Sequence, residues 1–523
     1  MSGIECPSKV IVAVVATALT LAACAWMKPV AGPSPAVSKS DPRLSVEPLA
    51  LLNRITGGAD VLSAQRLAEL GSEQFLEQQL RPLSNPALPA EVQAQIDAMT
   101  ISLKPMDRLV IEAEQQRRHI VTIPNDDEKR AAQRAYQQEL NRLAREAATR
   151  SLFRALYSPN QLQEQMTWFW MNHFNLYQFK GNLRAMIGDF EERAIRPHAL
   201  GNFRDLLVAT IYHPAMLRYL DNYNNAVGRI NENYARELME LHTLGVDGGY
   251  TQTDVQELAR ILTGLGLNVT DRTPNLRANQ QSQYRRDGIF EFNPNRHDYG
   301  DKQFLGNTVQ GRGLAEVNEV ADRLSRHPST ARFISRKLAI YFVADDPPQT
   351  LIDRMELAFM GSNGNIATTL REMFRSPEFA PSLGNKFKDP RNYVVSAVRL
   401  AYGDRVILNA GPMIFWLNRM GQPLYGRQTP DGYPLTEAGW TSSGQMTARF
   451  EIARAIASGN APLFQADGRQ PAEGPVVPHL ANTLYYDTLQ NKLSATTRQA
   501  LEKANSTHEW NTFFLSSPEF MHR

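Results

Sequence analysis

The stretch Asn231-Glu-Asn-Tyr-Ala-Arg-Glu-Leu-Met-Glu-Leu-His-Thr-Leu-Gly245 carries a strong helical period and decides the fold class. Side chains three and four residues apart lie on the same face of a helix. That spacing collects the large apolar residues of the stretch on one face, namely Tyr234, Leu238, Leu241 and Leu244. The pattern predicts an amphipathic helix. Similar periods dominate the rest of the chain, while alternating β patterns are nearly absent.

A neighbouring face of the same predicted helix carries Asn233, Glu237 and Glu240. On this helix Arg236 can reach Glu232 and Glu240, which lie one turn away in either direction. Two interpretations stay open. The carboxylates Glu237 and Glu240 are a general acid and base whose pKa values are held apart, or they belong to an ion-pair lattice that locks helices together.

Capping signals predict the ends of other helices. Thr251 and Asp254 have the spacing of a capping box at a helix start. Further upstream, we expect Asp126 or Asp127 to cap a helix of about 30 residues that ends near Tyr157. These signals extend the helical prediction to both sides of the opening stretch.

The segment 288–311 departs from the helical pattern. Within it, Ile289-Phe-Glu-Phe292 and Gln303-Phe-Leu-Gly306 are predicted to pair as a hairpin. We therefore expect a mostly α fold, with a large multi-helix globular body over 48–523 and a small β-hairpin insertion near residues 288–311. The body is long enough for two closely packed lobes, 48–287 and 312–523.

The N-terminus has the pattern of an export signal. Lys9 is followed by an apolar run from Val10 to Leu21, which is shorter than the roughly 20 residues that a membrane-spanning helix needs. The run ends in Leu21-Ala-Ala-Cys24, which resembles the bacterial lipobox. We expect residues 1–23 to be a lipoprotein signal peptide. The alternative is an ordinary secretory signal with an incidental cysteine.

Acylation of Cys24 would make membrane lipid the first partner of this protein, because several acyl chains anchor a protein stably. Ala25 after the cysteine favours the outer membrane of the bacterial envelope. Residues 24–47 are rich in Pro, Ser and Ala without a hydrophobic period, which predicts a flexible tether.

Composition excludes several function classes. Cys6 leaves with the predicted signal and Cys24 is committed to lipid, so the mature body has no cysteine for a disulfide or a thiol nucleophile. The net charge is +2 without a concentrated basic block, so we expect no nucleic-acid partner. The sequence has no Gly-x-Ser-x-Gly elbow, no phosphate loop and no His-Glu-x-x-His pattern. No metal site and no cofactor are identified.

Two further segments carry candidate site residues. Trp168-Phe-Trp170-Met-Asn172-His173-Phe-Asn175 is an aromatic helix end with polar exceptions. It is either a pocket wall, with the two tryptophans and Asn172 as binding residues, or core in which His173 is hydrogen-bonded at a helix terminus. His297, Asp298 and Lys302 lie on a glycine-containing loop that the fold either brings to a pocket or leaves solvated.

Many short motifs together resemble the bacterial family called domain of unknown function 1800. They include Tyr157-Ser-Pro159, Asn172–Asn175, Arg196–Phe203, Tyr219-Leu-Asp221, Asn231–Leu244, Gly248–Thr251, His297-Asp298, Ser376–Phe379, Gly421-Gln-Pro423 and Pro430-Asp-Gly432. The resemblance implies an exported, mostly helical protein. It also implies a partner, because genes of this family often lie beside those of another exported family that looks sulfatase-like. It supplies no reaction.

The favoured hypothesis for function is an envelope-anchored scaffold or partner-binding lipoprotein, because a tether is predicted and no diagnostic catalytic motif is present. The alternative is a hydrolase-type enzyme that acts on an envelope polymer or carbohydrate. In it Glu237 and Glu240 are the acid and base, and His173, Arg236 or His297 supports them. That alternative requires one open cleft, lined by Trp168 or Trp170, around His173, Glu237 and His297.

Overall fold

A computed structural model of the 523-residue chain describes residues 47–270, 272–403, 405–465, 474–482 and 484–523. The predicted signal peptide, the predicted lipidation site Cys24 and nearly all of the predicted tether therefore lie outside the described residues. The described residues belong to one contact-dense unit. Within the described part, no helix is both long enough and apolar enough to cross a membrane.

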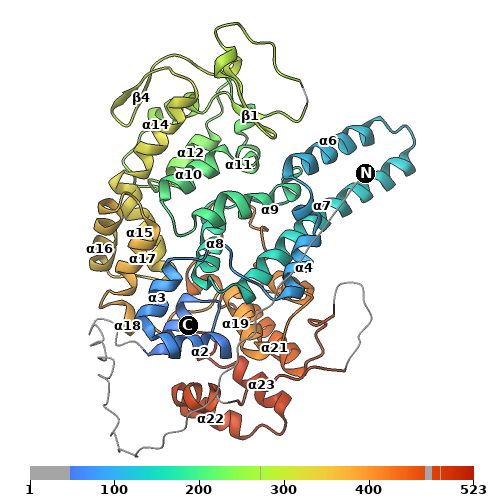
Figure 1. Ribbon diagram of the computed structural model, residues 1–523, viewed down its shortest axis with the longest axis vertical. Helices are drawn as coiled ribbons and strands as arrows, with labels where there is room; N and C mark the ends of the chain where they lie inside the picture. Colours follow the sequence, from blue (N-terminus) through green and yellow to red (C-terminus); the bar gives the residue numbers. More distant parts are fainter. Residues whose placement is uncertain (1–46, 271, 404, 466–473, 483) are drawn as a thin grey trace, which may run out of the picture. The chain divides into compact units, whose positions relative to one another are not determined.

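The prediction of a mostly α fold with a small β insertion is confirmed (Figure 1). The helices before the insertion are α1 (Pro48–Ile55), α2 (Val61–Leu70), α3 (Ser72–Leu80), α4 (Ala90–Ala98), α5 (Thr100–Leu103), α6 (Met106–Thr122), α7 (Asp126–Tyr157), α8 (Gln161–His173), α9 (Ile187–Asp189), α10 (Phe203–Tyr212), α11 (Pro214–Tyr219), α12 (Asn233–Glu240) and α13 (Gln252–Ile261). A π-helical segment, η3 (Phe190–Ile195), follows α9.

The helices after the insertion are α14 (Leu314–Ser325), α15 (Pro328–Phe342), α16 (Gln349–Gly361), α17 (Ile366–Phe374), α18 (Phe379–Ser382), α19 (Pro390–Tyr402), α20 (Gly411–Arg419), α21 (Ser443–Ser458), α22 (Ala495–Glu502) and α23 (Thr507–Leu515). Helices α15, α16 and α17 pack in sequence, and α21 packs against α23. Helix α7, from before the insertion, packs against α19 and α20, from after it. The two predicted lobes thus share contacts, and their division stays a prediction.

Local sequence explains several helix ends. The opening stretch forms α12, which buries Tyr234 and Leu238 as its period predicts. Thr251 and Asp254 form the predicted capping box at the start of α13, so one backbone donor is satisfied by each side chain. The long helix α7 ends at Tyr157 as expected. Its cap is Asn125 and not Asp126 or Asp127, because the Asn125 side chain accepts from the first backbone amides of the helix.

The predicted pairing within the insertion is wrong in detail. Strand β3 (Phe290–Phe292) pairs with β1 (Leu265–Leu267) and β2 (Arg285–Asp287), all antiparallel. Strand β4 (Lys302–Phe304) pairs with β5 (Asn307–Val309) in a separate sheet. The reason is local. Leu305 and Gly306 both have positive φ, at 49° and 72°, which makes the two-residue turn that folds a strand back on the residues directly after it.

A buried ion network joins α8 to the π-helical segment. The guanidinium of Arg196 binds the carboxylates of Glu164 on α8 and of Glu191 on η3, and all three side chains are at most 7% exposed. The hydroxyl of Tyr425 donates to Glu191 at 2.5 Å. Since a buried charge needs a charged partner and further hydrogen bonds, this network fixes the position of the chain around Tyr425 against the helical core.

Candidate functional site

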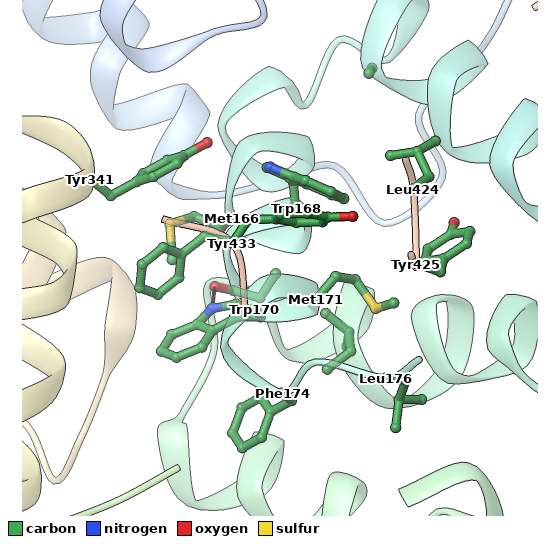
Figure 2. Close-up of a cluster of buried hydrophobic side chains, with 14 of the residues drawn as sticks. Met166, Trp168, Trp170, Met171, Phe174, Leu176, Tyr341, Leu424, Tyr425 and Tyr433 are labelled. Atoms are coloured by element: carbon green, nitrogen blue, oxygen red, sulfur yellow. Dashed lines mark hydrogen bonds between the residues drawn. The ribbon is translucent and has the colours of Figure 1, made fainter. Parts of the chain in front are cut away.

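The aromatic end of α8 is core. Trp170 is fully buried and donates from its indole nitrogen to the carbonyl of Ala199 at 2.9 Å, while Trp168 is 5% exposed. Figure 2 shows both tryptophans among the buried side chains of Met166, Phe174, Tyr341, Tyr425 and Tyr433. Neither indole presents a surface to a ligand in this arrangement. The helical period located these residues on a helix but could not say which surface they face.

Two asparagines after these tryptophans hold a distant loop, residues 427–433. The amide of Asn172 donates to the carbonyl of Tyr433 at 3.0 Å and accepts from the Tyr433 amide at 2.7 Å. The amide of Asn175 donates to the carbonyls of Arg427 and Thr429, at 3.0 and 2.8 Å. Between these anchor points, Gly432 has φ 78° and passes so close that an added Cβ would lie 2.2 Å from the Asn172 carbonyl oxygen. The side chains of Asn172 and Asn175, called the clamp below, therefore fix the backbone on both sides of residue 431.

The last residue of α8, His173, is sealed in the interior and is 1% exposed. The ammonium of Lys337, on α15, donates to its Nδ1 at 2.9 Å. Because an ammonium group can only donate, Nδ1 is the acceptor and the ring proton is on Nε2, which donates to the His242 carbonyl at 3.0 Å. Burial, then the charge of Lys337, holds the pKa of His173 well below its ordinary value. His173 is therefore a neutral support for Lys337.

Lys337 is the first functional candidate that the sequence did not indicate. Its ammonium lies 5.4 Å from the ring centroid of Phe333, one turn earlier on α15. Burial lowers the pKa of Lys337 to about 8, and the nearby carboxylate of Asp431 partly opposes that effect. The amine is thus close to its titration point at neutral pH. The helical pattern of α15 gave no signal that its one lysine would meet a loop about ninety residues downstream.

The carboxylates of Glu237 and Glu240, on α12, have no hydrogen bond and no ion pair within the described part of the chain. Arg236 turns away from both. It binds Glu232 at 3.1 Å and the side chain of Gln252 at 2.9 Å. The expected ion-pair lattice is therefore not formed at Glu237 and Glu240. Burial raises the pKa of Glu237, and repulsion from Glu240 and Asp431 adds to that rise, with Arg236 partly opposing.

Asp431 lies on the clamped loop, and its environment shifts its pKa in the opposite direction. Partial burial favours the neutral acid. Hydrogen bonds from Arg427, at 2.9 Å, and from the hydroxyl of Thr429 outweigh that effect and lower the pKa of Asp431. The ionised group interacts electrostatically with Glu237, Lys337 and Tyr219.

Tyr219 ends α11 and donates from its hydroxyl to the carbonyl of Gln428 at 2.8 Å, on the same loop. Burial first, then the charges of Glu237 and Asp431, raises the pKa of its phenol. Five side chains are thus coupled by charge or contact and are called the α12 site below: Tyr219, Glu237, Glu240, Lys337 and Asp431.

A family model described as "Protein of unknown function (DUF1800)" matches residues 50–522. The chain belongs to this family. No curated protein and no solved structure matches. Family membership supplies no reaction, but the matched range contains all of the α12 site. Motifs that carry the resemblance and are far apart in sequence meet there, namely Asn172–Asn175, Tyr219–Asp221, Asn231–Leu244 and Pro430–Gly432.

Backbone strain lies next to the α12 site of this DUF1800 chain. Among the described residues, four that are not glycine have positive φ, and Asp221 (62°) and Tyr425 (58°) are two of them. Lys180 ties Asp221 in place by donating to its carboxylate at 2.8 Å and to the Tyr219 carbonyl at 2.5 Å. The carbonyl of Tyr425 accepts from the Gln178 amide at 3.0 Å. Strained residues that the surroundings hold in place are concentrated at functional sites.

The candidates from the insertion form a different, closed cluster. His297 contacts the carboxylate of Glu316 at 2.9 Å and the carbonyl of Thr263 at 2.8 Å, and the ammonium of Lys302 binds Glu316 at 2.5 Å. The side chains of His297, Lys302 and Glu316 are all 0% exposed. Asp298 binds Arg260. None of these hydrogen bonds involves a residue of the α12 site.

Thr263, His297 and Glu316 are arranged in the order of a catalytic triad, with a hydroxyl, an imidazole and a carboxylate. These three residues cannot act as a catalytic triad. The Thr263 hydroxyl donates to the Arg260 carbonyl at 2.5 Å, so its proton faces away from the imidazole, and none of the three side chains reaches solvent.

The structure thus separates the predicted site residues. Glu237 and Glu240 join the α12 site, and Asn172 and His173 support it. Asn233, exposed at the start of α12, donates to the Leu220 carbonyl at 3.1 Å.

Metal binding has no geometric support in the part of the chain that the structure covers. No group of three or more His, Cys, Asp or Glu side chains is arranged there to hold an ion.

Proposed function

We propose that this DUF1800 protein is a lipid-anchored, partner-binding protein of the bacterial envelope, and that the α12 site binds a cationic or hydrogen-bond-donating group of the partner. One observation carries the proposal. Glu237 and Glu240 are partly buried, lie one turn apart and have no hydrogen bond or ion pair to a side chain among the described residues. Such an arrangement costs folding free energy and gains nothing within the fold, because desolvation and like charge both disfavour it. A donor group of a ligand relieves both costs.

The anchor in this proposal is Cys24, in the Leu21-Ala-Ala-Cys24 motif, with the outer membrane as the location. The family resemblance points to an exported sulfatase-like protein as the partner. Replacement of Cys24 by serine removes the thiol that is acylated. We therefore expect the Cys24→Ser protein in the soluble periplasmic fraction, while the wild-type protein sediments with membranes. Co-sedimentation of both proteins would contradict the anchor.

The binding part of the proposal is tested with two double variants of the full mature protein. Glu237→Gln/Glu240→Gln keeps the side-chain shapes and removes both unpaired charges. The matched control, Glu139→Gln/Glu146→Gln, changes two helical glutamates that both pair with Arg142. Binding to the purified sulfatase-like protein encoded by the neighbouring gene is measured by surface plasmon resonance. We expect at least a tenfold loss of affinity in the first variant only, and equal affinity in both would overturn the role of the α12 site.

A second candidate function has its own supporting observation. The environments of Glu237 and Asp431 shift their pKa values in opposite directions, which is the pattern of a general acid beside an ionised base. The described residues do not form the open cleft that the sequence-based hydrolase required, because Trp168, Trp170, His173 and His297 are all buried. In a revised version the protein is a hydrolase of an envelope carbohydrate, with Glu237 as proton donor and Asp431 as base. Asp431 then takes the role that the sequence suggested for Glu240. His173 and His297 contribute no catalysis, since both are buried and engaged.

The hydrolase version predicts the release of reducing ends from peptidoglycan glycan strands incubated with the purified protein. A positioned general acid typically accelerates such a step by about 10²- to 10⁴-fold. We expect Glu237→Gln and Asp431→Asn each to lose at least a hundredfold of the rate, and Glu139→Gln to keep it. Unchanged release in Glu237→Gln would exclude this mechanism.

A further inference from the structure

A cavity of about 90 Å³ lies between α1, α19, α23 and the residues that follow α23. It shares no residue with the α12 site. Most of its wall is apolar, with Leu400 from α19, Leu493, Phe514 from α23 and Phe520. An apolar cavity of this size would ordinarily stay empty. The polar residues in its wall therefore decide what it holds.

The decisive residue in that wall is Lys388, just before α19. It is 3% exposed, and its ammonium forms no hydrogen bond and no ion pair within the described residues. Its one specific contact is with the face of Phe520, whose ring centroid lies 3.9 Å from Nζ. Buried ammonium groups are normally paired, because taking an unpaired charge out of water costs several kcal/mol. The unpaired nitrogen lines the cavity and is free to donate into it.

The charged neighbours of Lys388 do not compensate it. The carboxylate of Glu519 accepts from the Ser494 amide at 2.8 Å and from the Thr497 hydroxyl at 2.9 Å. Both of its oxygens are therefore engaged. The carboxylate of Asp389 caps α19 by accepting from the backbone and side-chain amides of Asn392. No described carboxylate thus remains for the ammonium of Lys388.

Other cations surround this position and increase the excess of positive charge. Burial, with added repulsion from Arg523 and Arg449, holds the pKa of Lys388 well below its ordinary value. Arg449 is fully buried, lies against the rings of Phe387 and Tyr393, and leaves two of its guanidinium nitrogens without a partner. His522 also lines the cavity. An anion in the cavity would offset the burial and the repulsion that disfavour the protonated amine of Lys388.

The wall offers a second donor opposite the apolar side chains. Asn53, on α1, uses its side-chain oxygen to accept from the Ala59 amide at 2.9 Å. Its side-chain nitrogen has no partner among the described residues, and the residue lines the cavity. Lys492 in the same wall is ion-paired with Glu47. The ammonium of Lys388 and the side-chain amide of Asn53 are thus two donors without a partner among the described residues, and a carboxylate can accept from both with its two oxygens.

We propose that this cavity binds a short-chain monocarboxylate, with its carboxylate on the ammonium of Lys388 and its alkyl group against Phe514 and Phe520. The volume of the cavity supports a ligand with a short alkyl chain. A cavity of about 150 Å³ holds benzene, and this one is smaller, at about 90 Å³. The ligand is thus an acid of about two to four carbons.

The test compares butyrate with butyramide, its uncharged analogue of the same shape, by isothermal titration calorimetry on the full mature protein. We expect butyrate to bind at a single site and butyramide to bind at least tenfold more weakly. Lys388→Met is expected to lose the difference between the two ligands. Lys492→Met is the matched control, because Lys492 lines the same cavity but is already paired with Glu47. It should bind butyrate within about threefold of wild type.

Two results would overturn the proposal. One is equal affinity of the wild-type protein for butyrate and butyramide, and this comparison holds even where Lys388→Met fails to fold. The other is no heat of binding for butyrate, acetate and propionate at millimolar concentration. Neither result affects the α12 site, because Glu237→Gln/Glu240→Gln should bind butyrate like wild type.

Discussion

The α12 site and the insertion cluster of His297, Lys302 and Glu316 have similar residue types but opposite states of pairing. In the insertion cluster every charged group has a partner, Glu316 also accepts from the amides of Arg312 and Gly313, and nothing is exposed. In the α12 site two carboxylates have no partner and one amine is near its titration point. The difference teaches that completed hydrogen bonding marks a structural cluster, while unpaired charge that solvent can reach marks a candidate site.

The largest expected effect is in the insertion cluster. Glu316→Gln leaves the buried ammonium of Lys302 without its carboxylate, so we expect a loss of about 3–5 kcal/mol in the free energy of unfolding. Urea unfolding followed by circular dichroism measures it. The control is Glu319→Gln, in a partly exposed pair with Arg312 and Arg323, which should cost at most about 1 kcal/mol. A loss in Glu316→Gln no larger than in this control would contradict the structural role of the insertion cluster.

A smaller effect is expected at the clamp that supports the α12 site. Asn172→Ala leaves the buried amide and carbonyl of Tyr433 without their side-chain partner, which costs about 1–3 kcal/mol. The same variant should weaken partner binding, because the loop that carries Asp431 is released. Asn295→Ala, which loses only an exposed bond to the Asn275 carbonyl, should change neither property. Urea unfolding and surface plasmon resonance on both variants measure the two effects.

The smallest effect is expected from Glu237 itself. Glu237→Gln removes an unpaired, partly buried charge, so the free energy of unfolding at neutral pH should change by less than about 1 kcal/mol, with a gain the expected sign. A loss above about 2 kcal/mol would show that Glu237 is structural after all. Such a loss would mean that Glu237, like Glu316, stabilises the fold, and the contrast between the two clusters would fail.

The pH dependence of the same variant sharpens this prediction. The folded-state pKa of Glu237 lies above its unfolded value, so its contribution to stability is fully present below the unfolded pKa and is lost as pH rises through the folded pKa. Wild type should therefore lose stability relative to Glu237→Gln as pH rises from below the ordinary carboxyl value of 4.5 toward neutral. Parallel pH profiles of the two proteins would contradict the raised pKa.

Sequence reasoning succeeded where the information is local. The period of 231–245 predicted α12 and its buried face, the Thr251–Asp254 spacing predicted a cap, and the motifs predicted the family. It failed where distant segments meet. Asp431, about two hundred residues downstream, interacts with Glu237 of α12, and Lys337, about one hundred residues downstream, joins the site through Asp431. No local pattern records such contacts.

The errors within the insertion and on α8 have equally physical causes. Because Leu305 and Gly306 have positive φ, the chain turns back directly after β4 and β4 pairs with β5. The alternation of apolar residues did not indicate this pairing. For Trp168 and Trp170 the pattern predicted an aromatic helix end with polar exceptions, and such a helix end can be either a pocket wall or core. In the structure both tryptophans are buried, so this helix end is core.

The clamp on residues 427–433 has a consequence for how this protein can change. Asn172 and Asn175 hold the loop only through its main-chain amide and carbonyl groups. Loop conformation is therefore largely independent of which side chains the loop carries, apart from Gly432, where a side chain has no room. A protein engineer can exchange a residue such as Gln428, which contacts Tyr219 through its main-chain carbonyl, and so alter what is recognised while the scaffold beneath remains the same.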